Sequence, residues 1–388
     1  MRSPQAESHL LLACSVALAL SLVGCSDASV PTPLPVIGSL QYEGDQFEVW
    51  ASDGRAACGG TYQAVEAWLM ALRRRVGDAG IHERHRFYWV SEEDDALLPC
   101  PFGVACAYVG ERIIYSPWIP NEHEIVHLEL GDREGPSLLT EGSAELFGSL
   151  DSSAVIARFP IADVLDVWPI PGDAYQSAGR FSAYLAEVYG LETYLALLKA
   201  ASSGRNEQDL RTAFDGILGT SVDDAIGAYE EAPACAVSRW RFHDLECRDL
   251  PLVPWEGTGR WEQTIVLDCA RDDVVGPRPS DPRGSLDAFD GGSPDEIWTT
   301  RAIEVPERDG PYRFSVESDD AAEARLEPCF ARCFDEAVPL ETRIQPSPVV
   351  RTGGAYVNLI PAGRYWLRVA HDAASAASVK VVIEPSED

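Results

Sequence analysis

Hydrophobic residues recur at helical spacing through the first half of the chain. In TYQAVEAWLMALRRR, residues 61–75, one apolar face contains Val65, Trp68, Leu69 and Leu72. The arginines that close this stretch suit the negative end of a helix dipole. The same spacing predicts further helices over residues 121–130, 137–148, 176–189, 191–201, 206–215 and 221–230.

Shorter runs predict strands. The aromatic run 86–90 reads as one strand, and residues 106–116 read as a hairpin that turns at Gly110. From about residue 250 onward, Gly, Pro and Asp separate short alternating runs at 260–268, 298–305, 312–318, 355–360, 364–370 and 378–384. We therefore expect an α+β protein with a mixed domain over 41–233 and an all-β sandwich or jelly roll over 250–388.

The N-terminal segment differs from both domains. An apolar run over residues 10–23 has the length of a signal-peptide core and is short for a membrane span. It ends in LVGC, which resembles the lipobox of bacterial lipoproteins and implies lipidation at Cys25. Ser26 after that cysteine favours the outer membrane, with the protein facing the periplasm or the cell surface. Residues 1–25 thus read as a lipoprotein signal peptide, with an ordinary cleaved signal or an uncleaved anchor as the alternatives. Residues 26–40 read as a Pro/Ser-rich tether.

Composition and charge narrow the function classes. The chain has 388 residues, of which 46% are hydrophobic, and its formal net charge is −31. So acidic a surface repels phosphate backbones, and nucleic-acid binding is therefore not expected.

Cysteine usage agrees with export. Apart from Cys14 and Cys25, the chain has eight cysteines and no CxxC pair, so disulfides are favoured over a zinc–thiolate site. Spacing alone does not determine connectivity. The candidate pairs are Cys100–Cys106, Cys235–Cys247 and Cys329–Cys333, with Cys58 left for a distant partner such as Cys269.

The pentapeptide HEIVH contains the first candidate chemistry. His123 and His127 lie one helical turn apart, so both imidazoles leave the same face and can bind zinc together. Glu124 is rotated from them by about 100°, which suits a base that takes a proton from an attacking water. The motif still needs a third ligand.

The next predicted helix supplies candidates for that ligand. Glu141 and Glu145 share one face of the otherwise apolar SLLTEGSAELFG, residues 137–148. Buried carboxylates are costly unless they bind a cation or accept hydrogen bonds. One of them would bind the metal, and the other would accept a hydrogen bond from a ligand histidine.

This stretch resembles the gluzincin metallopeptidases, in which HExxH is followed by a helix with the third ligand in a motif such as N-E-G-x-A. TEGSAE matches that motif at Glu141, and Glu145 falls where the second acid of a related E-x-x-x-D motif lies. The resemblance implies a small N-terminal sheet followed by helices, and it covers residues 42–232. Its implied site consists of the zinc ligands His123, His127 and Glu141, the base Glu124, and the supporting acid Glu145.

The spacing leaves one alternative open. The interval from His127 to Glu141 is close to that of the peptidase MA-like group and shorter than that of thermolysin-like enzymes. If Glu145 were the ligand instead, the interval would be longer by one helical turn.

Other positions bear on the reaction. The aminopeptidase motif G-x-M-E-N is absent from the sequence, which favours an endopeptidase. Tyr175, at a predicted helix start, is the best candidate to donate a hydrogen bond to the oxyanion, although it could also simply pack there. His82 and His85 have no acidic or thiolate neighbour at ligand spacing in a strong motif, so we expect them in a solvated loop.

The all-β region weakly resembles the C-terminal jelly rolls of secreted bacterial proteases. Its pairs Asp272–Asp273 and Asp319–Asp320 could bind Ca²⁺, although exposed turns are the favoured explanation.

The resulting hypothesis is a membrane-anchored zinc endopeptidase with one Zn²⁺ per chain and a peptide or protein substrate. In it, a metal-activated water attacks the peptide carbonyl, and Glu124 accepts and returns the proton. The alternatives are a non-catalytic surface binding protein on a degenerate peptidase fold and a zinc hydrolase that acts on another bond.

Overall fold

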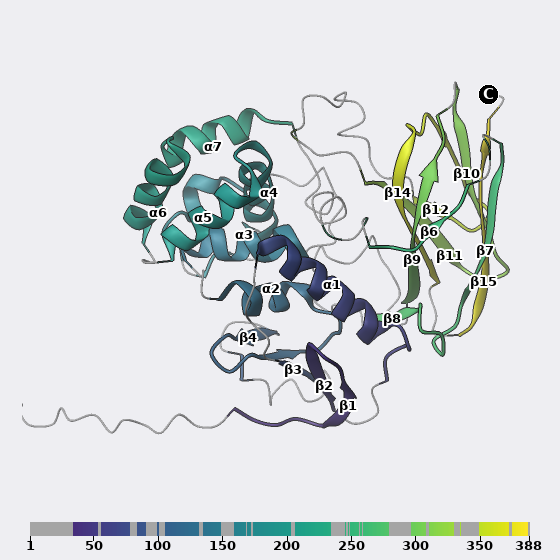
Figure 1. Cartoon of the computed structure of the whole chain (residues 1–388), viewed down its shortest axis with the longest axis horizontal. Coiled ribbons are helices and arrows are strands. Elements are labelled where there is room, and N and C mark those ends of the chain that lie inside the picture. The colour runs from purple at the N-terminus through teal and green to yellow at the C-terminus, as the bar shows by residue number, and fades with distance from the viewer. Residues whose placement is uncertain are drawn as a thin grey trace, which may run out of the picture. The chain divides into compact units, whose positions relative to one another are not determined.

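The computed structural model describes most of the chain from Leu34 onward. The described residues are 34–52, 56–77, 84–90, 99–100, 105–131, 135–148, 159–167, 169–171, 174–202, 206–233, 245, 247, 249–255, 257, 259–278, 296–307, 310–329, 334, 349–371 and 375–386. They contain seven α-helices and three sheets, so the protein is mixed and consistent with the expected α+β class (Figure 1). The predicted signal peptide and lipidated Cys25 lie outside the described residues.

A five-stranded mixed sheet begins the fold, in the order β1-β2-β3-β5-β4. Its strands are β1 (Ser39–Glu43), β2 (Phe47–Ala51), β3 (His85–Trp89), β4 (Cys106–Tyr108) and β5 (Ile113–Ser116). The neighbours β2, β3 and β5 run parallel, whereas β4 pairs antiparallel with β5 at the sheet edge. The predicted hairpin over residues 106–116 is therefore confirmed.

Helix α1 (Thr61–Val76) shares a core with this sheet. Its buried Val65, Trp68, Leu69 and Leu72 join Phe47 and other strand residues in one hydrophobic cluster. These helix residues are the predicted apolar face. The helix ends at Gly77, whose left-handed backbone (φ 72°) suits glycine.

The other helices follow the sheet and form the helical part of the fold (Figure 1). They are α2 (Glu122–Leu130), α3 (Ser137–Gly148), α4 (Tyr175–Val188), α5 (Leu191–Ala201), α6 (Glu207–Ala213) and α7 (Val222–Glu231). Helix α3 is buried along its whole length and packs against both α2 and α4. All six correspond to predicted helices within a few residues.

Two sheets make up the C-terminal region. The first has the order β13-β10-β15-β7, and the second contains β12-β11-β14-β9-β6, with β8 paired to β9. The strands are β6 (Leu252–Val253), β7 (Trp261–Leu267), β8 (Val275–Arg278), β9 (Glu296–Val305), β10 (Tyr312–Glu317), β11 (Ala322–Pro328), β12 (Val349–Arg351), β13 (Ala355–Asn358), β14 (Gly363–His371) and β15 (Ala377–Pro385). Inward side chains of both sheets, among them Phe314 and Leu367, share one core, as in a β-sandwich.

The start of α1 is joined covalently to the C-terminal region. A disulfide links Cys58 to Cys269, and the Gly59 amide donates to the Cys269 carbonyl at 2.8 Å. The Thr61 hydroxyl donates to the Gly276 carbonyl at 3.0 Å. The distant pairing expected for Cys58 is thus confirmed.

The remaining described disulfides confirm one expectation and correct another. Cys100 pairs with Cys106 as expected, but Cys247 pairs with Cys329. The local pairs Cys235–Cys247 and Cys329–Cys333 were wrong, because Cys247 and Cys329 both pack beside Trp366 of β14. Cys235 and Cys333 lie outside the described residues.

Among the described residues, no helix is long and apolar enough to cross a membrane.

Candidate metal centre

The first two candidate ligands lie on α2, whose start is held by the preceding strand. Asn121 caps the helix by accepting a hydrogen bond from the Glu124 amide at 3.3 Å. Its side-chain amide donates to the Ser116 hydroxyl, at the end of β5, at 3.0 Å. This cap fixes where the helix begins and which way His123 and His127 point.

Helix α3 supplies the third candidate ligand and lies very close to its neighbours. A Cβ at Gly142 would lie 2.7 Å from the Ala178 carbonyl oxygen of α4. A Cβ at Gly148 would lie 2.7 Å from the His123 backbone nitrogen. Glycine at these two positions therefore permits the close helix contacts that bring Glu141 to the histidines.

Three donor atoms converge at the centre of the site. Glu141 Oε2 lies 3.2 Å from His123 Nε2 and 3.3 Å from His127 Nε2, and the two nitrogens are 3.2 Å apart. Ligands bound at about 2 Å to a tetrahedral zinc ion lie about 3.3 Å from one another. Within the described residues, this is the group whose atoms could hold a metal ion together.

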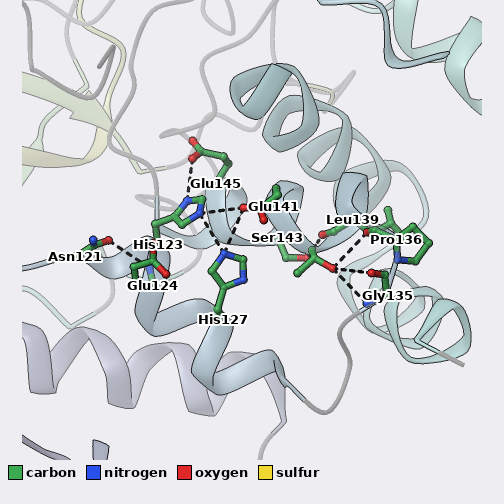
Figure 2. Close-up of polar contacts among 11 residues, drawn as sticks. Asn121, His123, Glu124, His127, Gly135, Pro136, Leu139, Glu141, Ser143 and Glu145 are labelled. Carbon is green, nitrogen blue, oxygen red and sulfur yellow. Dashed lines mark hydrogen bonds and ion pairs between the residues drawn. The ribbon is translucent and has the colours of Figure 1, made fainter. Parts of the chain in front are cut away.

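The second carboxylate of α3 contacts the other face of one histidine. Glu145 Oε1 lies 2.9 Å from His123 Nδ1, and Figure 2 shows it on the side of the ring away from His127. A carboxylate in this position fixes the ring orientation and leaves Nε2 available for a metal. Glu141 thus contributes one of the three converging donor atoms, whereas Glu145 contacts the other ring nitrogen of His123.

Burial and charge shift the proton affinities of these groups. Burial alone would lower the pKa of His123, but its hydrogen bonds to Glu141 and Glu145 raise it well above its usual value. For Glu141, burial acts to raise the pKa, but the two histidines hold it well below its usual range. A cation that binds here would have to displace the histidine protons, so metal binding would weaken at low pH.

Glu124 and Tyr175 border the three donor atoms. Burial raises the pKa of Glu124, and its carboxylate also interacts with the charges of His127 and His123. The Tyr175 ring, at the start of α4, lies 5.7 Å from the His123 ring. Burial and the nearby carboxylates raise the pKa of Tyr175, so its phenol keeps the proton that it would donate.

The structure differs from the expectation for His85. It opens β3 and is 2% exposed, so its placement in a solvated loop was wrong; His82 lies outside the described residues. Parallel pairing with β2 carries His85 into the sheet, where its Nε2 contacts the Glu129 carboxylate. The signal overlooked was Glu129 itself, an acid on the apolar face of the predicted helix.

The Asp pairs considered for calcium are not part of a metal group among the described residues. Asp273 forms ion pairs with Arg271 and Arg301. Cation binding is therefore not needed to explain this carboxylate.

Comparisons with known proteins give limited information. No protein-family model matches the chain, and no curated protein matches it. The chain is similar to the structure of Legionella pneumophila aminopeptidase A, with 10% identity and a TM-score of 0.34. The match covers 88% of this chain and 36% of that one. The chain thus spans about a third of the length of that aminopeptidase.

Two other solved structures are similar to smaller parts of the chain. One is Aeromonas hydrophila PliG, a periplasmic inhibitor of g-type lysozyme (9% identity, TM-score 0.19, 35% of this chain and 96% of that one). The other is hydroxypropylphosphonic acid epoxidase from S. wedmorenis (10% identity, TM-score 0.12, 53% of this chain and 96% of that one). At these TM-scores, none of the three similarities defines a function for this chain.

Proposed function

We propose that this protein is a zinc-dependent peptidase of the gluzincin type. The observation that supports this most strongly is the set of three donor atoms from His123, His127 and Glu141, all 3.2–3.3 Å apart. Two imidazoles and one carboxylate are the donor set of several catalytic zinc sites, which keep a fourth position for water or substrate. The gluzincin arrangement of sheet and helices is part of the same proposal.

The chemistry divides between the metal and the protein. Zinc, when bound, supplies Lewis acidity that polarises the peptide carbonyl and acidifies water. Glu124 takes a proton from the attacking water as its oxygen bonds to the carbonyl carbon. It then returns that proton to the leaving amine as the C–N bond breaks. The raised pKa of Glu124 suits a group that must both take and release a proton.

Tyr175 is proposed to stabilise the oxyanion that forms when the carbonyl is attacked. Replacing it by phenylalanine is expected to lower kcat by about 10²- to 10³-fold, the usual loss for one oxyanion donor. Zinc content and KM should change little, because the aromatic ring is retained. The measurement is steady-state cleavage of a peptide, with Tyr189→Phe at the far end of α4 as the matched control. Wild-type kcat in Tyr175→Phe would show that Tyr175 only packs against His123.

The proposal also includes a location for the protein at the outer membrane. The lipobox at Cys25 and the disulfides among later cysteines fit an exported lipoprotein whose tether holds the body away from the outer membrane. The substrate would then be a peptide or protein in the periplasm or outside the cell.

Metal removal tests the proposal directly. Purified protein is expected to contain about one zinc per chain and to cleave an unfolded protein substrate. A strong zinc chelator should abolish cleavage, and added zinc should restore it, because the donor set is retained in the metal-free chain. Metal analysis and a cleavage assay measure both. Folded, zinc-supplied protein that binds no zinc would refute the proposal, whereas zinc binding without cleavage would favour the non-catalytic binding protein.

A further inference from the structure

A second cluster of ionisable groups lies on the opposite side of the metal-site helix. Glu129 follows His127 by two positions on α2, so its side chain is rotated by about 200° away from the histidine face. Its side chain is 0% exposed. Arg73 of α1 binds both carboxylate oxygens, with Nε 2.9 Å from Oε2 and Nη2 2.8 Å from Oε1.

Groups from the sheet complete this cluster. His85 Nε2 contacts Glu129 Oε1, and Arg112, just before β5, places Nη2 3.6 Å from the same oxygen. The guanidinium groups of Arg73 and Arg112 each lie 3.3 Å from His85 Nε2. The Glu129 carboxylate is therefore contacted by side chains from α1, from β3 and from the segment just before β5.

The backbone at Arg112 indicates that this contact is specific. Arg112 has a φ of 56°, the one positive value at a non-glycine position among the described residues. Such a conformation is unfavourable for most residues and is easier for glycine or asparagine. An arginine here accepts that strain while directing its guanidinium toward Glu129 and His85.

Stability alone does not account for the cluster. A buried ion pair is often no more stabilising than apolar residues of similar volume, because desolvation offsets the attraction. Its directional hydrogen bonds, however, can fix the position of the helix that contains Glu129. Helix α2 has only nine residues, and Gly131 at its end has right-handed backbone angles (φ −54°) in place of the left-handed ones that commonly end a helix. The contacts of Glu129 therefore hold the end of α2 where such a terminal glycine conformation does not.

We infer that Glu129 is a positioning residue for the metal centre. Held by Arg73, His85 and Arg112, it sets the rotation and axial position of α2. Asn121 fixes the start of the helix and Glu129 fixes its end, so the two histidine nitrogens stay at the spacing that one metal ion requires. This inference rests on the proposed function, because it assumes that His123, His127 and Glu141 bind zinc.

The test compares Glu129→Gln with a matched variant elsewhere. Glu129→Gln keeps the side-chain shape but removes the charge, and we expect zinc affinity to fall by about tenfold or more, the scale for groups that orient metal ligands. The visible spectrum of the cobalt-substituted protein should also shift, since it reports coordination geometry. Glu327→Gln is the control, because Glu327 pairs with Arg325 in β11. The side chains of Glu327 and Arg325 are 1% and 4% exposed, against 0% and 7% for those of Glu129 and Arg73.

A more conservative variant, Arg73→Lys, tests the same inference if Glu129→Gln does not fold. Arg73→Lys keeps the positive charge but loses the two-pronged contact, so it should fold and weaken zinc binding by a smaller factor. The expected pattern is weaker zinc binding and an altered cobalt spectrum in the Glu129 and Arg73 variants, with Glu327→Gln lowering only thermal stability. Wild-type zinc affinity and an unchanged cobalt spectrum in the folded variants would overturn the inference. A wild-type protein that binds no zinc would instead refute the proposed function.

Discussion

Replacing Glu124 by glutamine is expected to lower kcat for peptide cleavage by about 10²- to 10⁴-fold, the usual contribution of a general base. Glutamine has nearly the same shape but cannot take a proton from water at neutral pH. Glu124 is not among the three donor atoms that converge in the site, so zinc content should remain at the wild-type level. Metal analysis and steady-state kinetics on the same preparation measure both quantities.

The control for Glu124→Gln must remove a carboxylate from the same position in another helix. Glu124 lies in the first turn of α2, where a carboxylate also interacts favourably with the helix dipole. Glu192 occupies the first turn of α5 and is exposed, so Glu192→Gln reproduces the lost dipole interaction away from the candidate centre. Full activity of Glu124→Gln, with zinc bound, would remove Glu124 from the mechanism.

The helices could be predicted well because apolar residues recur at helical spacing along their sequences. The range 137–148 agrees with α3 at both ends, and 191–201 agrees with α5. The predicted helix over 206–215 differs at its end, since α6 stops at Ala213 and a π-helical turn follows over Phe214–Leu218. Helix ends depend on tertiary contacts, which local periodicity does not record.

One strand with buried charged residues, β11, was missed. Strand β11 contains Arg325 and Glu327, which are 3% and 1% exposed and hydrogen-bond to each other. Charged residues in a sequence indicate an exposed segment unless their ion-pair partners are known. The segment AEARLEP was therefore not predicted to be a strand. The same limit applies to His85, whose partner Glu129 is 44 residues away in the sequence.

The residues of the candidate metal centre were easier to predict from the sequence than the cluster around Glu129. The reason is that most of the metal-site geometry is set within single helices. Helical spacing alone brings His123 and His127 onto one face, and the buried position of Glu141 and Glu145 follows from the apolar residues around them. The cluster around Glu129 joins α1, β3 and α2, and nothing in the local sequence links those elements. Spacing also left open which of Glu141 and Glu145 reaches the metal, because both lie on the same face of one helix.

Glutamine substitutions at Glu141 and Glu145 are expected to separate these two roles. In the structure, Glu141 Oε2 lies within 3.3 Å of both Nε2 atoms, whereas Glu145 reaches only Nδ1 of His123. Glu141→Gln should therefore lose stoichiometric zinc, because a neutral amide is a poor zinc ligand. Glu145→Gln should keep zinc but bind it about 10- to 100-fold more weakly, because His123 loses the carboxylate that orients it.

The two variants are matched controls for each other, since they make the same chemical change one helical turn apart on one buried helix. Zinc affinity measured by competition with a chelator, together with the cobalt spectrum of each protein, compares them directly. Circular dichroism should show that both fold, because neutral glutamine can still hydrogen-bond to the neighbouring histidines. The opposite pattern, with zinc lost from Glu145→Gln and retained by Glu141→Gln, would make Glu145 the ligand. Equal, wild-type zinc binding in both would mean that neither carboxylate of α3 holds the metal.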